Sequence, residues 1–116
     1  MSLQDKTVRL SELIIRAKAI YEEHRQSKKE ADFFKTVKPF ADEMDTAADL
    51  WEQEALHFLQ EYPQKYVHAA QIMQAADNAR RVGAHAYFFD TGKAKFIQSA
   101  DSALYVLESL DNCIKE

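Results

Sequence analysis

Glu54 and His57 have the spacing in this chain that is most typical of a chemical site, a Glu-x-x-His pair. In di-iron carboxylate bundles, this spacing places a carboxylate and an imidazole on one inward face of a helix. Such a centre needs the pair twice and two further glutamates from other helices, and the sequence contains no second copy. His57 also lies about 100° or more around the helix from the apolar stripe at Trp51. We therefore interpret the pair as surface residues, with a metal-binding or enzymatic site as the alternative.

The other histidines, His24, His68 and His85, are separated along the chain. His24 and His68 fall on or near apolar stripes at the ends of two expected helices. If those ends lie at the same level of an antiparallel bundle, the two side chains form a polar cluster and become further candidate metal ligands. In the alternative, His68 caps its helix and His24 lies near solvent. We predict no catalytic residue and no cofactor, because no motif places a nucleophile beside a base and two isolated glycines cannot form a phosphate-binding loop.

Four carboxylates, Asp42, Asp45, Asp49 and Glu52, lie three or four residues apart and therefore share one helix face. They belong to an acidic segment, residues 31–62, which carries two basic and eight acidic side chains. We interpret this face as solvated, because acidic residues are favoured near a helix start and a polar stripe away from the core faces water. The alternatives are a docking surface for a basic partner and a weak cation site.

Two pairs of adjacent phenylalanines, Phe33–Phe34 and Phe88–Phe89, are the apolar candidates for an interaction surface. Neighbouring side chains on a helix diverge by about 100°, so one member of each pair stays partly exposed unless a connecting segment covers it. An uncovered pair forms an apolar patch of the kind that marks an interface.

Helices must position these residues, because a chain with only two Gly and two Pro in 116 residues has few breaks in its periodicity. The spacing of apolar residues predicts a first helix over about residues 3–25. Three more stripes with helical spacing run from Val37 to Tyr62, from Ile72 to Phe89 and from Phe96 to Ile114, and each belongs to a long helix. Pro63 ends the second, and Asp90-Thr91-Gly92 provides a C-cap for the third.

The connection between the first two helices carries its own start signals. Ser27-Lys-Lys-Glu30 predicts a capping box, and Asp32 is a second N-cap candidate for a short helical turn through Phe33 and Phe34. Pro39 interrupts that turn or lies in the first turn of the next helix, where its missing N–H costs little.

Four long segments joined by tight turns predict an all-α, up-and-down four-helix bundle with a left-handed twist, forming a single domain over residues 1–116. A stripe of small residues on the third helix, from Ala75 to Ala86, predicts close approach of a neighbouring helix. A groove for a partner or an apolar ligand is the alternative for that stripe.

Charge and cysteine content argue against several classes of partner. The net charge is −4 and the sequence pI is about 5.6, which gives no electrostatic footprint for nucleic acid or an anionic membrane. The lone Cys113 rules out an internal disulfide and suits a reducing compartment. The N-terminus does not have the pattern of a secretory leader, and the apolar runs are too short to span a bilayer. We expect a cytoplasmic protein.

Several motifs over most of residues 31–110 have a familiar combination. They are Asp32-Phe-Phe-Lys-Thr-Val-Lys-Pro39, Lys65-Tyr-Val-His68, Gln71-Ile72, Asp77-Asn78 and Ser102-Ala-Leu-Tyr-Val-Leu107. Together these motifs resemble the YppE-like proteins, small uncharacterised bacterial proteins of Gram-positive type. The resemblance implies an up-and-down four-helix bundle and implies no activity. The chain departs from the family pattern by an extra residue near Gln64 and by Ala-Tyr-Phe-Phe after His85, where the resemblance would place further histidines.

We therefore expect a non-enzymatic protein that acts through contact with an unidentified protein partner. This hypothesis rests on the absence of a recognisable site in the sequence, together with the spare aromatic residues and the acidic helix face. The alternative is a bundle with a histidine–carboxylate site for metal binding or catalysis. We expect a monomer or a weak homodimer, because four helices can close a core without a second copy.

Overall fold

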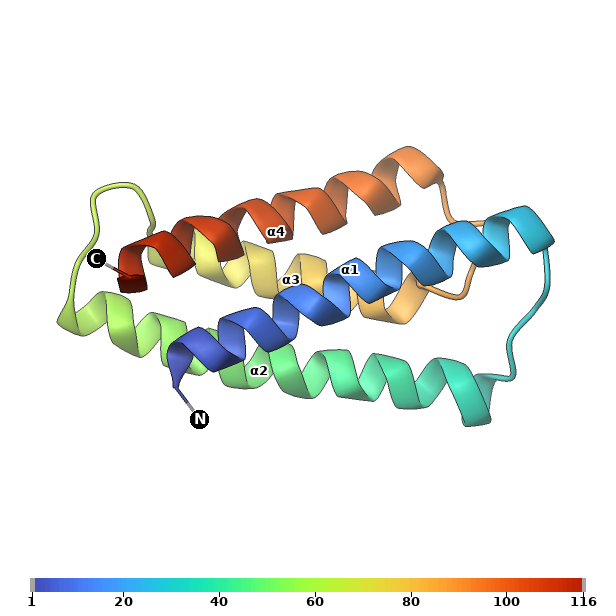
Figure 1. The fold of residues 1–116 in the computed structure, drawn as a ribbon, viewed down its shortest axis with the longest axis horizontal. Helices are drawn as coiled ribbons and strands as arrows, with labels where there is room; N and C mark the ends of the chain where they lie inside the picture. The colour runs from blue at the N-terminus through green and yellow to red at the C-terminus, as the bar shows by residue number, and fades with distance from the viewer. Residues whose placement is uncertain (1, 116) are drawn as a thin grey trace.

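The computed structural model describes residues 2–115, and Figure 1 shows long helices that run alternately in opposite directions. The elements are α1 (Leu3–Ser27), the short π-helical turn η1 (Phe33–Val37), α2 (Lys38–Glu61), α3 (Ala69–His85) and α4 (Lys93–Lys115). The described residues contain no β-strand. The predicted all-α four-helix bundle is thus confirmed. Within residues 2–115, no helix combines the length and the apolar character needed to cross a bilayer.

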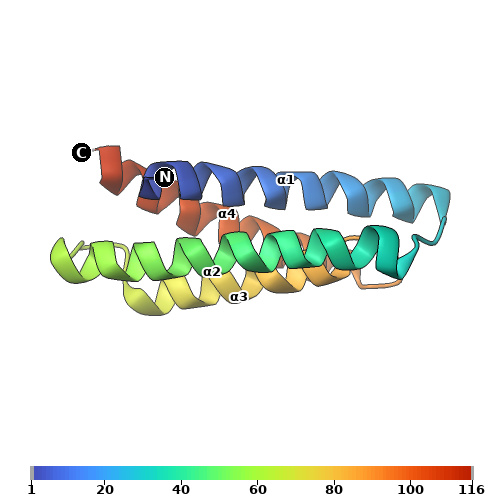
Figure 2. The same cartoon turned by 90° about the horizontal axis from the view of Figure 1, so that it is seen from below.

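The connections lie at two opposite ends of the bundle (Figures 1 and 2). The chain termini and the α2–α3 connection share one end, which we call the terminal end. The α1–α2 and α3–α4 connections share the other end. We call it the aromatic end, because these connections and the adjoining turn η1 carry Phe33, Phe34, Phe88 and Phe89. The molecule measures 46 × 26 × 20 Å along its principal axes.

The ends of α1 and α2 follow local signals in the sequence. Ser2 and Asp5 form a capping box at the start of α1, and Lys28 ends this helix in the left-handed conformation with φ of 56°. The capping box predicted from Ser27 is wrong, because Ser27 is still the last residue of α1. Asp32 caps η1 as predicted, since its Oδ1 accepts a hydrogen bond of 2.8 Å from the Lys35 N–H. Pro39 lies in the first turn of α2.

The predicted end of α3 is wrong, whereas its start follows His68, the N-cap candidate. The helix begins at Ala69 and ends at His85, and residues 86–92 form turns. Hydrogen bonds from Phe88 N–H to the His85 carbonyl and from Thr91 N–H to the Phe88 carbonyl satisfy this backbone in place of helical bonds. Gly92 is therefore no C-cap of α3. Its carbonyl instead accepts the Phe96 N–H in the first turn of α4.

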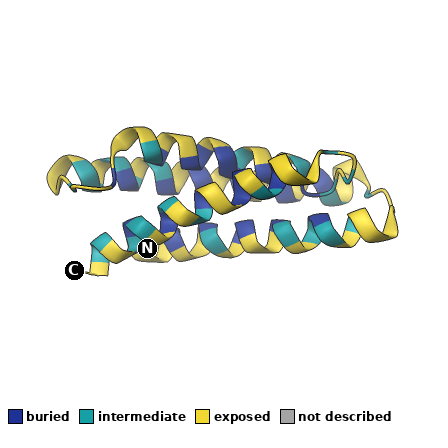
Figure 3. Ribbon diagram, turned by 90° about the horizontal axis from the view of Figure 1, so that it is seen from above, coloured by how far each residue is buried: buried dark blue, intermediate teal, exposed yellow. Residues whose placement is uncertain are grey.

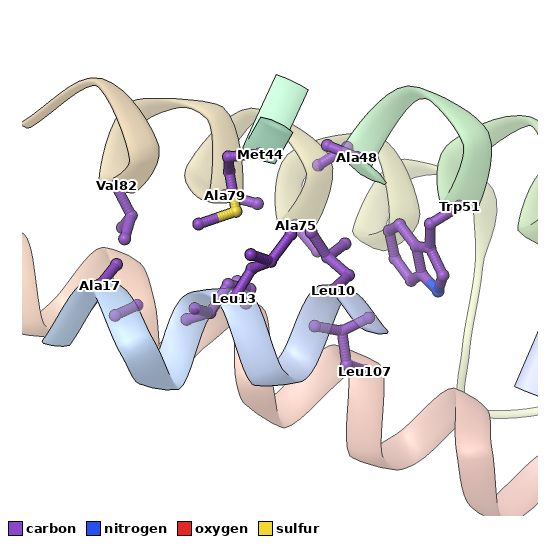
Figure 4. Packing of buried hydrophobic residues seen from close by; sticks show 14 of the residues in the cluster. Leu10, Leu13, Ala17, Met44, Ala48, Trp51, Ala75, Ala79, Val82 and Leu107 are labelled. Atoms are coloured by element: carbon purple, nitrogen blue, oxygen red, sulfur yellow. The ribbon is translucent and has the colours of Figure 1, made fainter. Parts of the chain in front are cut away.

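The core runs along the bundle axis and draws side chains from all four helices, as the buried surfaces in Figure 3 and the packing in Figure 4 show. Trp51 is fully buried, and its Nε1 donates a 3.1 Å hydrogen bond to Oγ1 of Thr7. The Thr7 hydroxyl in turn donates to the Leu3 carbonyl at 2.8 Å. The indole therefore lies in the core with its one polar atom satisfied, as its place in the apolar stripe predicts.

The small-residue stripe of α3 packs against α2. Its members Ala75, Ala76, Ala79, Gly83 and Ala86 are all buried. A Cβ added at Gly83 would lie 2.6 Å from the Cβ of Met44, so α2 approaches α3 more closely there than any side chain on Gly83 allows. The stripe thus lies in the core, and at Gly83 it is a packing surface for α2.

Candidate functional site

The structure gives Glu54 and His57 separate partners. Oε1 of Glu54 accepts a 3.0 Å hydrogen bond from Nζ of Lys6 on α1. This bond and the positive charge of Lys6 lower the pKa of Glu54 below its ordinary value. His57 Nε2 lies 3.1 Å from Oε1 of Glu61, one turn further along α2, and both side chains are exposed. The two residues of the Glu-x-x-His pair therefore do not converge on one inward site.

His24 and His68 lie at opposite ends of the bundle, so the expected shared cluster does not form (Figure 1). The ring of His24 contacts the edge of Tyr87 at a centroid distance of 5.0 Å at the aromatic end. His68 is the N-cap residue of α3 at the terminal end, where its N–H donates to Oε1 of Gln71. In an up-and-down bundle α1 and α3 run in the same direction, so the end of α1 and the start of α3 lie at opposite ends of the molecule. Residues 2–115 contain no group of three His, Cys, Asp or Glu side chains suited to a metal ion.

The acidic face of α2 is partly neutralised by α3. Nη2 of Arg80 lies 2.7 Å from both Oδ1 of Asp49 and Oε1 of Glu52, and its Nη1 lies 2.9 Å from Oδ1 of Asp77. Partial burial opposes the charge on Arg80, but the hydrogen bonds to Glu52 and Asp49 outweigh that effect and raise its pKa. The sequence interpretation missed this ion-pair network, because it treated the face as either solvated or available to a partner.

The remaining carboxylates of that face are arranged differently. Asp42 pairs with Lys38 one turn earlier on α2, at 2.8 Å. Partial loss of hydration, together with repulsion from Asp49 and Asp42, raises the pKa of Asp45 despite attraction from Arg80. Asp49 and Glu52, half of the predicted acidic face, thus pair with Arg80 of α3. Asp45 is the member of the face whose charged form is disfavoured.

The aromatic end brings together the two phenylalanine pairs that are more than fifty positions apart in the sequence. Phe33, Phe34 and Phe88 are 51%, 79% and 42% exposed, and Phe89 is half-buried. The rings of Phe33 and Phe34 meet edge to face, with their centroids 5.1 Å apart. Within residues 2–115, Phe33, Phe34 and Phe88 therefore remain at the surface, whereas Phe89 is partly covered.

A hollow of about 370 Å³ lies at this end, between the α1–α2 and α3–α4 connections. We call it the aromatic hollow; its lining is Glu30, Ala31, Val37, Tyr87, Phe88, Phe89 and Asp90. The lining holds two carboxylates and no basic side chain, although Lys28 and Lys29 precede Glu30 in the chain. Within the described residues, neither Glu30 nor Asp90 takes part in an ion pair. The hollow therefore offers aromatic surface and uncompensated negative charge together.

The chain is similar to bacterial proteins whose function is unknown. Residues 7–114 match the model of a family described as "Bacterial domain of unknown function (DUF1798)". The uncharacterized protein YppE of Bacillus subtilis strain 168 is 30% identical over 109 residues, which cover 94% of this chain and 89% of YppE. The crystal structure of that YppE has a TM-score of 0.92 and covers 97% of this chain and 92% of its own.

A crystal structure of a protein of unknown function from Listeria innocua has a TM-score of 0.94 at 26% identity, covering 99% of this chain and 92% of that protein. These similarities confirm the resemblance inferred from the sequence motifs. They also confirm the fold that it implied.

Proposed function

The chain belongs to the DUF1798 family of bacterial proteins of unknown function, and we propose that it is a binding protein whose aromatic end docks onto another protein. The observation that carries this proposal is the exposure of Phe33, Phe34 and Phe88 beside the aromatic hollow. Monomeric proteins rarely leave such apolar surface uncovered, and exposed patches of this kind mark interaction sites. Aromatic side chains also dominate the binding energy of many protein interfaces.

The lining of the aromatic hollow defines the chemistry of the partner. Glu30 and Asp90 supply negative charge, and the rings of Tyr87, Phe88 and Phe89 supply apolar and π surface. A segment that presents an apolar side chain next to Lys or Arg fits both features, since its cation is attracted by carboxylates and by aromatic faces. We therefore assign the partner as a protein with an exposed basic-apolar segment.

A displayed peptide library tests this assignment. The wild-type protein should enrich peptides in which an apolar residue is flanked by Lys or Arg, over peptides in which it is flanked by Asp or Glu. The double variant Phe33→Ser, Phe34→Ser should lose this enrichment without losing its fold, because both side chains are exposed.

Tyr66→Ser is the matched control, since Tyr66 is 77% exposed in the α2–α3 connection at the terminal end. This variant should retain the enrichment seen with the wild type. Absence of any sequence preference, or equal binding by the phenylalanine variant, would show that the aromatic end is not the docking surface.

We also propose that the protein works in the cytoplasm, as a monomer or a weak homodimer, without binding nucleic acid or membrane. The lone Cys113 supports a reducing compartment, and the net charge of −4 supports the absence of polyanionic partners. Sedimentation equilibrium over a range of protein concentrations tests the oligomeric state. A tight oligomer whose mass does not depend on concentration would contradict it.

A further inference from the structure

A second hollow lies between the C-terminal part of α3 and the start of α4, and three basic residues line it: Arg81, His85 and Lys95. We call it the α3–α4 hollow. Its volume is about 140 Å³, close to the ~150 Å³ of an engineered protein cavity that takes up benzene. Phe96 provides a buried apolar wall, and Ser99 is buried in the lining and provides a hydroxyl. The hollow thus combines a small apolar space with basic groups.

The basic residues of the α3–α4 hollow have no carboxylate partner within residues 2–115. None of Arg81, His85 and Lys95 takes part in an ion pair, and no acidic residue is in the lining. The Arg81 guanidinium donates only to the neutral Oδ1 of Asn78, at 3.3 Å. By contrast Arg80, the preceding residue, contacts three carboxylates.

The chain has more acidic than basic residues, 19 against 15, yet the lining of this hollow contains no acidic residue. Arg81 and Lys95, with no carboxylate in the lining, produce a local positive potential in a molecule of net negative charge. Such a potential attracts an anion from solution.

The start of α4 adds to this potential. The helix begins at Lys93, after Gly92, which has no side chain to accept a hydrogen bond from the first N–H groups. Lys95 lies in the first turn, so the positive end of the helix dipole is beside the hollow. The N-terminal end of α4 therefore adds to the positive charge of Arg81 and Lys95.

We propose that the α3–α4 hollow binds a small organic anion, a carboxylate or a phosphate monoester on an apolar body about the size of one benzene ring. Arg81 and Lys95 hold the anionic group from two different helices through charge-assisted hydrogen bonds, and the Ser99 hydroxyl donates to it. The apolar body contacts Phe96, whose ring is held in place by stacking on Tyr21 at a centroid distance of 4.1 Å. This site is independent of partner docking at the aromatic end, because different residues line it.

Titration of isotope-labelled protein with benzoate, phenyl phosphate, inorganic phosphate and neutral benzyl alcohol tests the proposal by NMR. Benzoate or phenyl phosphate should cause saturable shifts at the amides of Phe96 and Ser99, and the stronger of the two identifies the anionic group. Benzyl alcohol should bind at least about tenfold more weakly, because it lacks the charge-assisted hydrogen bonds. Inorganic phosphate should also bind more weakly, because it leaves the apolar wall uncovered.

Arg81→Gln and Lys95→Gln should each weaken binding by about tenfold or more. Lys93→Gln is the matched control, because it removes the same charge only two positions from Lys95. Lys93 pairs with Glu22 and is outside the lining. It should leave the affinity nearly unchanged. The two variants are tested separately, so that loss of fold in one leaves the other to test the site. Their thermal midpoints show whether each variant is folded.

Three results would overturn the proposal. The first is the absence of saturable shifts with both organic anions. The second is equal binding of benzyl alcohol, which would make the site merely apolar. The third is an equal loss of affinity in Lys93→Gln and in the two lining variants, which would reduce the effect to general charge.

Discussion

Adding one methyl group at Gly83 should destabilise this bundle, although Gly→Ala within a helix ordinarily stabilises. Gly83 lies in α3, where replacing Gly by Ala gains up to about 1 kcal/mol in helix propensity. However, the new Cβ would lie 2.6 Å from Cβ and 2.7 Å from Cγ of Met44 on α2. Carbon atoms in contact are ordinarily about 3.5–4.0 Å apart, so roughly 1 Å of overlap must be relieved.

The rigid part of Met44 decides the size of this effect. Its Cγ can move by rotation of the side chain, but its Cβ is fixed to the backbone of α2. The two helices must therefore separate locally, and overpacking of this kind costs about 1–3 kcal/mol. After subtraction of the propensity gain, we expect Gly83→Ala to lower the free energy of unfolding by about 1–2 kcal/mol. For a chain of this length, that corresponds to a melting temperature roughly 4–8 °C lower.

Urea denaturation followed by circular dichroism measures this difference, and two controls isolate its cause. Ala84→Gly, at the exposed neighbouring position on α3, measures the local propensity term and should cost about 1 kcal/mol. Gly92→Ala adds a methyl group that meets no atom within 4 Å, and its effect should stay within about 0.5 kcal/mol, since lower chain entropy and a poorer N-cap oppose each other. If Gly83→Ala raises the urea midpoint by as much as Ala84→Gly lowers it, the close approach of α2 and α3 at Gly83 is refuted.

Further predictions concern the core, the acidic face and metal binding. Trp51→Ala should lower the free energy of unfolding by about 3–5 kcal/mol, because the indole is fully buried; an unchanged urea midpoint would place Trp51 at the surface. Arg80→Met should cost about 1–2 kcal/mol at low salt and less at high salt, because it leaves Asp49 and two other carboxylates unpaired. Lys38→Met, which removes the exposed pair with Asp42, should cost under about 0.5 kcal/mol. Equal costs for Arg80→Met and Lys38→Met would contradict the stabilising role of the Arg80 network. The native fold raises the pKa of Asp45, so its charge opposes folding at neutral pH, and that penalty disappears as the pH falls below the unfolded pKa of about 3.9. Asp45→Asn should therefore raise the free energy of unfolding by a few tenths of a kcal/mol at about pH 7 and have almost no effect near pH 3. A lower free energy of unfolding at pH 7 would contradict the unfavourable charge of Asp45. Elemental analysis of protein purified without chelator should find no iron, zinc or manganese in stoichiometric amount, whereas a stoichiometric metal would restore the metal-binding hypothesis.

The helical stripes could be predicted from the sequence because each long helix has one apolar face. Leu10, Ile14, Ala17 and Tyr21 on α1 are all fully buried, as their spacing predicts. The same pattern overestimates the length of the core on α2. Tyr62 continues the stripe by spacing, yet it follows the last residue of the helix and is 61% exposed. Periodicity therefore identifies the face of a helix better than its end.

The ion-pair network of Arg80 could not be predicted, because the sequence does not fix the register between two neighbouring helices. Arg80 and Arg81 are adjacent and chemically alike, yet one lies between α3 and α2 and the other lines the α3–α4 hollow. Their directions differ by about 100° around the helix. The packing of α3 against α2, which is close at Gly83 and Met44, determines which arginine meets the carboxylates of α2.

The largest error in the sequence prediction, the end of α3, falls on the segment on which both proposed sites depend. Residues 86–90 contain neither Gly nor Pro, and their apolar residues continue the helical pattern. In the structure the helix stops at His85, and the following turn places Phe88 and Asp90 in the aromatic hollow and Thr91 in the α3–α4 hollow. The hydroxyl of Tyr21, from the core of α1, donates to the Thr91 carbonyl and so fixes this turn. Local sequence preference and tertiary structure disagree here, and such disagreement is expected where a segment serves function rather than stability.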